Sequence, residues 1–222
     1  MTSSGSRPVV LVVGAGPGVS GSVARLLGRG GYDVLLVGLE EHVLEELQES
    51  LRTDGVTAHW QAVDITDEEA FRSAVTALGE RFGRIDVLHF NPSAFRQRSP
   101  LELTPQELAT DVGLGVGALL TAVQAARPFM SSGGRVTATG SMAADRPWHQ
   151  AASLGVQKAG LRNLVHSIDA TLKPEGIRAV SVTVRGALAR EGSFTPDRVA
   201  AAIVAAADQD EADWHSEVPY SG

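Results

Sequence analysis

The segment VVLVVGAGPGVSG, residues 9–21, decides the fold class of this 222-residue chain. Its first five residues are aliphatic and predict a buried strand, and its last residues begin a pattern with helical spacing. Gly14, Gly16 and Gly18 stand between the two, where glycines permit a tight turn and let a phosphate approach the first N–H groups of the helix. A tight turn without a ligand is the alternative, but the order strand, glycine turn, helix favours nucleotide binding.

The same alternation of apolar runs and helical patterns continues from this segment to the C-terminus. Strands are expected at residues 9–13, 34–37, 57–63, 85–90, 135–139, 177–184 and 217–220, and helices at 19–29, 40–51, 67–82, 104–130, 151–172 and 195–207. This order predicts an α/β fold: a single-domain, doubly wound (Rossmann-type) parallel sheet of about seven strands with helices on both faces. Residues 1–7 are expected to form a flexible N-terminus.

Composition excludes several classes of function. The net charge is −7, with no massed Lys or Arg, so we expect neither a nucleic-acid partner nor an anionic membrane partner. The chain has no cysteine, and its six histidines show no spacing typical of zinc ligands, so no metal is expected. The first apolar run is too short for a signal peptide or a membrane span. We therefore expect a soluble cytoplasmic protein.

Several motifs resemble those of the short-chain dehydrogenase/reductase family, over essentially the whole chain. Residues 14–20 resemble the family's glycine turn, with Ser20 in place of the last glycine. Residues 63–66, Val-Asp-Ile-Thr, resemble the segment whose aspartate contacts the adenine ring. Residues 85–93 resemble the fourth strand and its Asn-Asn-Ala-Gly motif, of which only the second asparagine, Asn91, is kept.

This resemblance implies a nicotinamide dinucleotide at the carboxyl ends of the strands. The residues expected to bind it are Gly14, Gly16, Gly18, Val19, Leu39, Asp64, Ile65, Asn91, Lys158 and Gly186. Asp64 could instead cap a helix, and Asn91 could instead stabilise the loop that follows the fourth strand. The presence of no cofactor at all is a further alternative.

The end of the second strand favours NAD(H) over NADP(H). An acidic residue usually holds the ribose 2'-hydroxyl there, and an arginine holds a 2'-phosphate. Leu39 occupies the position and can do neither, whereas Glu40 and Glu41 follow it directly. A 2'-phosphate would meet repulsion from these two carboxylates.

The resemblance places Ser141 and Lys158 at the family's active-site spacing, but Leu154 stands where the family has its proton-donating tyrosine. Reduction of a carbonyl group requires a proton for the developing alkoxide. His149 is a candidate substitute, because histidine side chains exchange protons near neutral pH, although the pattern favours an exposed loop residue. Of the two tyrosines in the chain, Tyr32 should lie at the far end of the sheet, and Tyr220 could reach the site only if the C-terminal tail folded over it.

Other family features are also replaced. Gly115 stands where the family keeps an asparagine, Arg185-Gly186 replaces Pro-Gly, and Arg190 replaces a threonine. The short segment 187–194 leaves no room for a substrate lid, so we expect an open site.

Three functions remain open from the sequence. The first is an atypical oxidoreductase acting on a small carbonyl or alcohol compound. The second is a non-catalytic protein that binds a cofactor or a partner, and the third is a non-redox enzyme in which Ser141, Lys158 and His149 do acid–base work. The resemblance also implies a homodimer or homotetramer built from the helices expected at 104–130 and 151–172.

Overall fold

The computed structural model of the protein describes residues 7–222. Residues 1–6, most of the predicted flexible N-terminus, lie outside the described residues. Arg7, the last residue of that predicted segment, is anchored: its guanidinium lies 3.3 Å from both the Asp33 carboxylate and the Thr57 hydroxyl.

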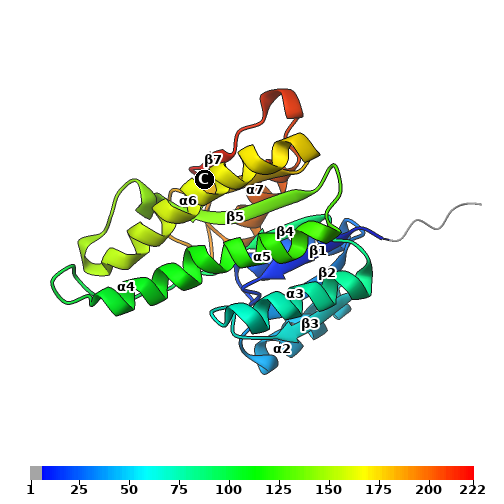
Figure 1. The fold of residues 1–222 in the computed structure, drawn as a ribbon, viewed down its shortest axis with the longest axis horizontal. Helices are drawn as coiled ribbons and strands as arrows, with labels where there is room; N and C mark the ends of the chain where they lie inside the picture. The colour runs from blue at the N-terminus through cyan, green and yellow to red at the C-terminus, as the bar shows by residue number, and fades with distance from the viewer. Residues whose placement is uncertain (1–6) are drawn as a thin grey trace, which may run out of the picture.

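A parallel sheet of seven strands, in the order β3-β2-β1-β4-β5-β6-β7, forms the centre of the molecule (Figure 1). The strands are β1 Val9–Val13, β2 Asp33–Gly38, β3 Ala58–Ala62, β4 Val87–Phe90, β5 Arg135–Ser141, β6 Arg178–Val184 and β7 Glu217–Tyr220. All pairings between neighbouring strands are parallel. The strand order reverses direction between β1 and β4, which is where open sheets of this kind bind ligands. The predicted fold class is confirmed.

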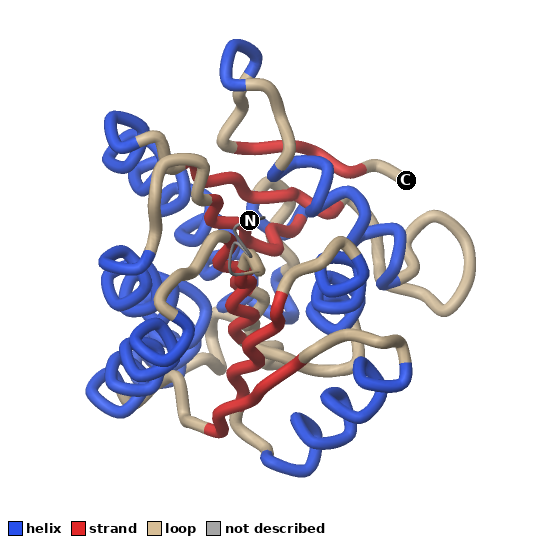
Figure 2. The backbone as a smooth tube through the Cα atoms, turned by 90° about the vertical axis from the view of Figure 1, so that its right-hand side faces the viewer, coloured by secondary structure: helices blue, strands red, loops and turns tan. Residues whose placement is uncertain are grey.

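Helices cover both faces of the sheet (Figure 2). They are α1 Val19–Arg29, α2 Glu41–Thr53, α3 Glu68–Phe82, α4 Pro105–Val112, α5 Ala118–Ala126, α6 Ala152–Leu172 and α7 Pro196–Ala207. Shorter turns are η1 Gly113–Gly117, η2 Arg127–Phe129, η3 Met142–Ala144, η4 His149–Ala151, η5 Lys173–Glu175 and η6 Glu211–Asp213. Apolar residues of α3, α5 and α6 share one core with the sheet, whereas α1, α2 and α7 pack on its other face.

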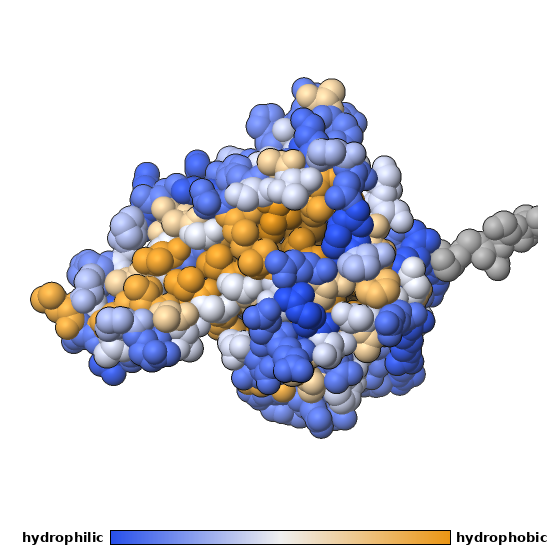
Figure 3. Space-filling view, viewed as in Figure 1, coloured by the Kyte–Doolittle hydropathy of each residue, from blue (hydrophilic) through white to orange (hydrophobic). Residues whose placement is uncertain are grey.

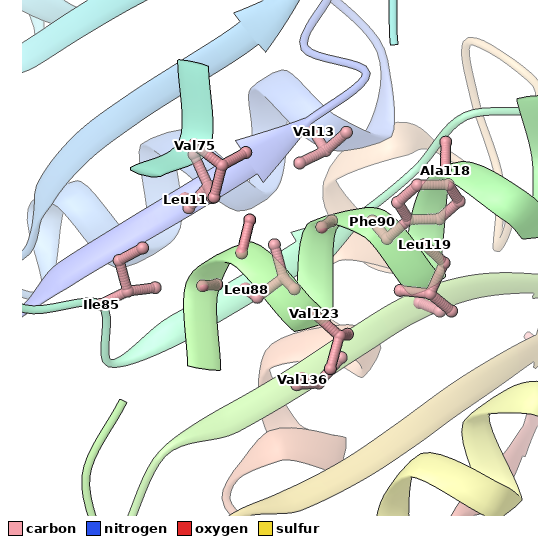
Figure 4. Close-up of a cluster of buried hydrophobic side chains, with 14 of the residues drawn as sticks. Leu11, Val13, Val75, Ile85, Leu88, Phe90, Ala118, Leu119, Val123 and Val136 are labelled. Atoms are coloured by element: carbon pink, nitrogen blue, oxygen red, sulfur yellow. The ribbon is translucent and has the colours of Figure 1, made fainter. Parts of the chain in front are cut away.

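The larger core lies between β1, β4 and β5 on one side and α3 and α5 on the other (Figure 4). Side chains alternate along a strand, so Leu11 of β1 and Leu88 and Phe90 of β4 point to this face, where Leu119 of α5 meets them. Phe90 and Leu119 are fully buried. This packing holds the carboxyl ends of β1 and β4 side by side.

Side chains at several helix starts satisfy free backbone N–H groups. The Thr104 hydroxyl accepts a hydrogen bond from the Glu107 N–H at 3.1 Å, and the Glu107 carboxylate accepts one from the Thr104 N–H at 2.9 Å. This reciprocal pair defines the start of α4. Thr195 caps α7 as the sequence predicted, with Pro196 in the first turn.

Residues 105–129 form one helical run, as the sequence predicts, although its α-helical geometry is interrupted. Its middle is a π-helical turn, η1, between α4 and α5. Gly115 in this turn is buried against Gln157 of α6, and a Cβ at position 115 would lie 2.5 Å from the Gln157 side-chain oxygen. The Gln157 side chain therefore occupies the space that a side chain at position 115 would need.

By length and apolar composition alone, the helical run Pro105–Phe129 could cross a membrane. Less than half of its most apolar window, 44%, is buried inside the described structure. The same run packs against α3 and α6, as a core helix of a soluble protein does, so the pattern carries little weight for a membrane.

Candidate functional site

A cavity of about 870 Å³ lies at the carboxyl ends of β1, β2, β4, β5 and β6, at the reversal of strand order. It is large enough for a drug-sized ligand or a cofactor. Predicted site residues that line it are Gly14, Gly18, Val19, Leu39, Asp64, Ile65, Asn91, Ser141, Lys158 and Gly186. Gly16 and His149 are the two predicted site residues outside the lining. Residues from seven parts of the chain thus meet at one place.

The glycine turn presents the N-terminus of α1 to this cavity. Gly14 adopts φ +75°, and a Cβ there would lie 2.8 Å from the Pro92 ring, so the position requires glycine. A Cβ at Gly18 would meet no atom within 4 Å, and no side chain caps the helix at this residue. The first N–H groups of α1 therefore remain available to a negatively charged ligand.

Ser20 has a local role in the turn. Its hydroxyl accepts a hydrogen bond from the Gly16 N–H at 3.1 Å. The residue that replaces the family's last glycine thereby shapes the turn itself, and the Gly16 N–H is not free for a ligand.

Asp64 lies on the cavity wall in a turn of its own. Its Oδ1 atom accepts hydrogen bonds from the Thr66 hydroxyl at 2.7 Å and from the Thr66 N–H at 2.9 Å, and these bonds lower the pKa of the carboxyl group. The cap of α3 is Asp67, not Asp64. Among the described residues, Oδ2 of Asp64 has no hydrogen-bond partner and can accept one from a ligand.

The opposite end of the cavity contains Lys158, whose side chain is buried in α6. Its Nζ donates a hydrogen bond to the backbone oxygen of Thr139 at 2.9 Å. Burial lowers the pKa of this amine to about 8, because the charged form loses hydration. A lysine with such a pKa exchanges its proton far more readily near neutral pH than an exposed lysine does.

Ser141 and Asn91 complete the polar part of this end. The Ser141 hydroxyl accepts a hydrogen bond from the Ala143 N–H at 3.2 Å, which leaves its own proton available to a ligand. The Asn91 side-chain oxygen accepts a hydrogen bond from the Thr139 hydroxyl at 2.8 Å. Asn91 thus cross-links the ends of β4 and β5 while it lines the cavity.

Leu154 also lines the cavity, four residues before Lys158 in α6. Residues at this spacing lie on the same face of a helix, one turn apart. The position next to the buried amine therefore carries an isobutyl group, which has no exchangeable proton to donate.

Gln157 is a residue of the site that the sequence did not indicate. Its side-chain oxygen accepts a hydrogen bond from the Ala94 N–H at 3.0 Å, and its side-chain nitrogen donates one to the Ala94 oxygen at 3.1 Å. The same amide fills the space next to Gly115. Gln157 therefore occupies the place that a longer residue at position 115 would need, and it fixes the loop that follows β4.

That loop, residues 91–100, is also held by an ion pair. Arg96 donates two hydrogen bonds of 3.0 Å to the buried carboxylate of Asp111, and these lower the pKa of Asp111. Beside it, Phe95 lines the mouth of the cavity and stacks on Trp148, with ring centroids 6.0 Å apart. Two aromatic rings are thereby held at the entrance.

The candidate proton donors lie away from Lys158. His149 is exposed in η4 and does not line the cavity, so the prediction that it replaces the tyrosine is not supported by its position. Tyr32 lies at the amino end of β2. Tyr220 is nearer than expected, because it pairs with Val184 at the carboxyl end of β6. Its hydroxyl, however, donates to the Ser193 oxygen at 2.5 Å, and the residue is not part of the cavity wall.

The segment after β6 forms a short, pinned loop. Ala187 and Leu188 line the cavity, and the Ala189 N–H donates to the Phe194 oxygen at 3.1 Å. The Phe194 ring packs under Gly186, where a Cβ would lie 2.4 Å from it. Arg185 and Arg190, which stand at the replaced family positions, are both exposed.

Comparisons with known proteins agree with this arrangement. A family model described as short chain dehydrogenase matches residues 8–189. An uncharacterized oxidoreductase of Listeria monocytogenes is 24% identical, over 91% of this chain and 91% of that protein. Trans-4-hydroxycyclohexanecarboxylate dehydrogenase of Sinomonas cyclohexanicum is 29% identical, over 80% of this chain and 71% of that protein. The crystal structure of a short chain dehydrogenase from Burkholderia cenocepacia in complex with NADP is 25% identical and superimposes with a TM-score of 0.88, over 97% of this chain and 96% of that one.

Proposed function

The chain belongs to the short chain dehydrogenase family, and on that premise we propose that it is an oxidoreductase that binds a nicotinamide dinucleotide and acts on a small carbonyl or alcohol compound. The observation that carries the proposal is the single cavity with an uncapped helix N-terminus at one end and Ser141 and Lys158 at the other. The Burkholderia cenocepacia structure, which contains NADP, adds support from the same fold.

The residues present fit such a cofactor. Gly18 has open space where a side chain would be, so the pyrophosphate can lie against the first turn of α1. Asp64 offers a free carboxylate oxygen to the amino group of an adenine ring. Lys158 is placed to hold the ribose next to the nicotinamide. When bound, the nicotinamide ring would supply or accept the hydride.

The protein's own residues would then handle the substrate oxygen. The Ser141 hydroxyl donates a hydrogen bond to it, because that proton is free. Lys158 is the acid in place of the absent tyrosine, since its lowered pKa makes its ammonium group a better proton donor than an ordinary lysine. We assign no role in proton transfer to the exposed His149.

For the choice between the two dinucleotides we propose NAD(H). Leu39 is 66% exposed at the end of β2, and the two carboxylates that follow it, Glu40 and Glu41, are exposed as well. These charges disfavour a 2'-phosphate. Their exposure weakens the effect, because water and salt screen surface charges.

A thermal-shift titration with NAD⁺, NADH, NADP⁺ and NADPH tests the binding part of the proposal. A ligand that binds the folded state raises the melting temperature with its concentration, and NADH is expected to do so at a lower concentration than NADPH. A panel of aldehydes and ketones with NADH then tests turnover, which Lys158→Ala should abolish. Absence of a shift with all four dinucleotides would contradict the cofactor assignment.

A non-catalytic, ligand-binding role is the second candidate function. It is favoured by Leu154. Among the residues that line the cavity, Leu154 is the nearest in sequence to Lys158, and its side chain has no exchangeable proton. In this case NADH would stabilise the protein, but no carbonyl compound would be reduced. Measurable hydride transfer would exclude this candidate.

We further propose that the protein forms a homodimer or homotetramer through α4, α5 and α6. Figure 3 shows apolar side chains gathered in a band over the face that carries these helices. Leu120 of α5 and Val156 of α6 are 44% and 49% exposed. Light scattering should show an oligomer for the native chain and a smaller species for Val156→Glu, whereas Gln61→Glu on the exposed side of β3 should leave the oligomer unchanged.

A further inference from the structure

The cavity contains a buried primary amine without a carboxylate partner. Lys158 is 5% exposed, and its Nζ has one hydrogen bond, to the Thr139 backbone oxygen. Asp64 is the only acidic residue among those that line the cavity, and its carboxylate is bonded to Thr66. Among the described residues, no carboxylate therefore holds Lys158 in its charged form.

Apart from Ser141 and Asn91, the wall around this amine is largely apolar. Leu154 lies one helical turn before Lys158, and Leu114 and Val184 line the same cavity from η1 and β6. Phe95 and Leu188, 63% and 56% exposed, stand at its entrance. An apolar wall keeps the amine poorly hydrated and also favours a ligand that carries an apolar group.

We propose that Lys158 forms an imine with an aldehyde or ketone that bears an aromatic or aliphatic group, and that this reaction needs no dinucleotide. The inference goes beyond the proposed function, because it gives the site a covalent, non-redox chemistry of its own. It rests on the buried amine, the absence of a counter-ion and the apolar wall. A desolvated lysine in an apolar pocket is one known way to activate an amine as a nucleophile.

The atoms of this step balance without an oxidant or a reductant. The lone pair of Nζ attacks the carbonyl carbon, so a C–N bond forms as the C=O π bond breaks, and one proton passes from nitrogen to oxygen to give a carbinolamine. The C–O bond then breaks as the C=N bond forms, and the hydroxyl group leaves as water with the second N–H proton. The Ser141 hydroxyl, whose proton has no acceptor among the described residues, donates a hydrogen bond to the carbonyl oxygen during the attack.

The neutral amine that this reaction needs is available near neutral pH. Burial lowers the pKa of Lys158 to about 8, so about one tenth of the molecules carry the neutral form at pH 7. An ordinary lysine, with a pKa near 10.4, is neutral in fewer than about one in a thousand molecules at that pH.

The chain provides an internal control, because Lys158 and Lys173 are its only lysines. Lys173 is exposed in η5, just before the amino end of β6, whereas the cavity lies at the carboxyl ends of the strands. A comparison of the two side chains within one molecule removes differences in concentration and reagent.

Reductive trapping tests the proposal. The full-length protein is incubated with benzaldehyde and sodium cyanoborohydride at pH 7, and the benzylated lysines are located by peptide mass spectrometry. Lys158 should be modified at least about tenfold faster than Lys173, since its larger neutral fraction outweighs its lower intrinsic nucleophilicity. Glycolaldehyde, which has no apolar group, should show a smaller preference for Lys158.

Three controls keep the result interpretable. In urea the two lysines should react at similar rates, because the environment of Lys158 is lost; this control does not depend on a folded variant. Lys158→Arg should lose the rapid phase, and Lys173→Arg should keep it. Equal rates in the native protein, or modification of Lys173 alone, would overturn the proposal.

The same experiment separates this proposal from the proposed function. If a dinucleotide binds against Lys158, then NAD⁺ added before benzaldehyde should slow the trapping. If no dinucleotide stabilises the protein, trapping at Lys158 should proceed unchanged, and only the oxidoreductase proposal fails. If dinucleotides bind but benzaldehyde does not react with Lys158, only the imine proposal fails.

Discussion

The two halves of the sheet differ in what they bury. On the nucleotide side, β1 and β2 bury aliphatic residues almost exclusively, and the glycine turn after β1 keeps an uncapped helix N-terminus. On the substrate side, β4 to β6 bury His89, Thr137, Ser181 and Thr183. His89 Nε2 and Ser181 Oγ have no hydrogen-bond partner among the described residues. The nucleotide side is therefore built on an almost purely apolar core, whereas the substrate side buries polar groups, which lowers the stability of the fold where they lack a hydrogen bond.

This difference coincides with the departures from the family pattern. The nucleotide side has glycines at positions 14 and 18 and an aspartate at 64, as the family resemblance implies, whereas the substrate side has Gly115 and Leu154 where that resemblance implies an asparagine and a tyrosine. Gln157 fills the space at Gly115 and bonds to Ala94, so the substrate side has its own packing. We infer that the two sides can be altered separately.

The largest effect is expected from a charge at the nucleotide side. Gly18→Asp places a carboxylate at the start of α1, where the structure has open space, so the fold should survive. Repulsion between this carboxylate and a pyrophosphate should weaken dinucleotide binding by roughly 10³-fold. This corresponds to a repulsion energy of about 4 kcal/mol between two unit charges about 4 Å apart at an effective dielectric constant near 20. Isothermal titration calorimetry measures the change. Gly18→Asn, which has the same shape without the charge, should lose much less; equal losses would show that space, not charge, matters.

A phenol on the substrate side should produce the next largest change. Leu154→Tyr places a hydroxyl one helical turn from Lys158, within the cavity. Reduction of a carbonyl compound by NADH is expected to rise by about 10²-fold, at the lower end of what a general acid supplies, because Gly115 provides no further proton relay. Leu154→Phe is the matched control without the hydroxyl. A similar gain in both variants would attribute the effect to packing and not to proton transfer.

A smaller effect tests whether Gln157 and Gly115 form one packing unit. Gly115→Asn should destabilise the protein by about 1–3 kcal/mol, because its side chain would collide with the Gln157 amide. In combination with Gln157→Ala the cost should fall below the sum of the two single changes. Urea unfolding of the four proteins gives the coupling free energy. Additive costs would mean that the two residues do not share the space.

The last expected effect concerns the polar core of the substrate side and depends on pH. Burial lowers the pKa of His89 to about 3, while Nδ1 lies 2.9 Å from the Thr137 hydroxyl. The unfolded chain takes up a proton on this residue below its ordinary pKa of about 6.5, and the folded chain does not. The contribution of His89 to the free energy of unfolding is therefore complete above pH 6.5. It is lost as the pH falls from about 6.5 to 3, by about 1.4 kcal/mol per pH unit.

Urea unfolding at pH 7 and pH 5 checks this prediction. His89→Leu should lack this part of the pH dependence, whereas substitution of the exposed His42 by Gln should keep it. If His89→Leu loses stability with falling pH as steeply as the native chain, then His89 is not the residue responsible.

The sequence by itself determined the fold class, all seven strands and the position of the ligand cavity. These features depend on local signals: a two-residue or 3.6-residue period of apolar side chains, and glycines between a strand and a helix. The carboxyl ends of parallel strands meet at one edge, so Gly14, Asp64 and Asn91 could be placed together without knowledge of their contacts. Of the ten residues that the family resemblance implies for the cofactor, nine line the cavity, the exception being Gly16.

Only the tertiary structure decided which residues occupy the space around the reactive groups. Three of these features join residues 27 to 63 positions apart in the chain, or depend on such contacts. They are the π-helical turn at Gly115, the bonds between Gln157 and Ala94, and the hydrogen bond from the Tyr220 hydroxyl to Ser193. His149 follows the active-site strand closely in sequence, yet it is exposed outside the cavity. Periodicity reports which face of an element is buried, but not which distant side chain meets it there. The burial of Lys158, and with it its lowered pKa, is such a property of the assembled fold.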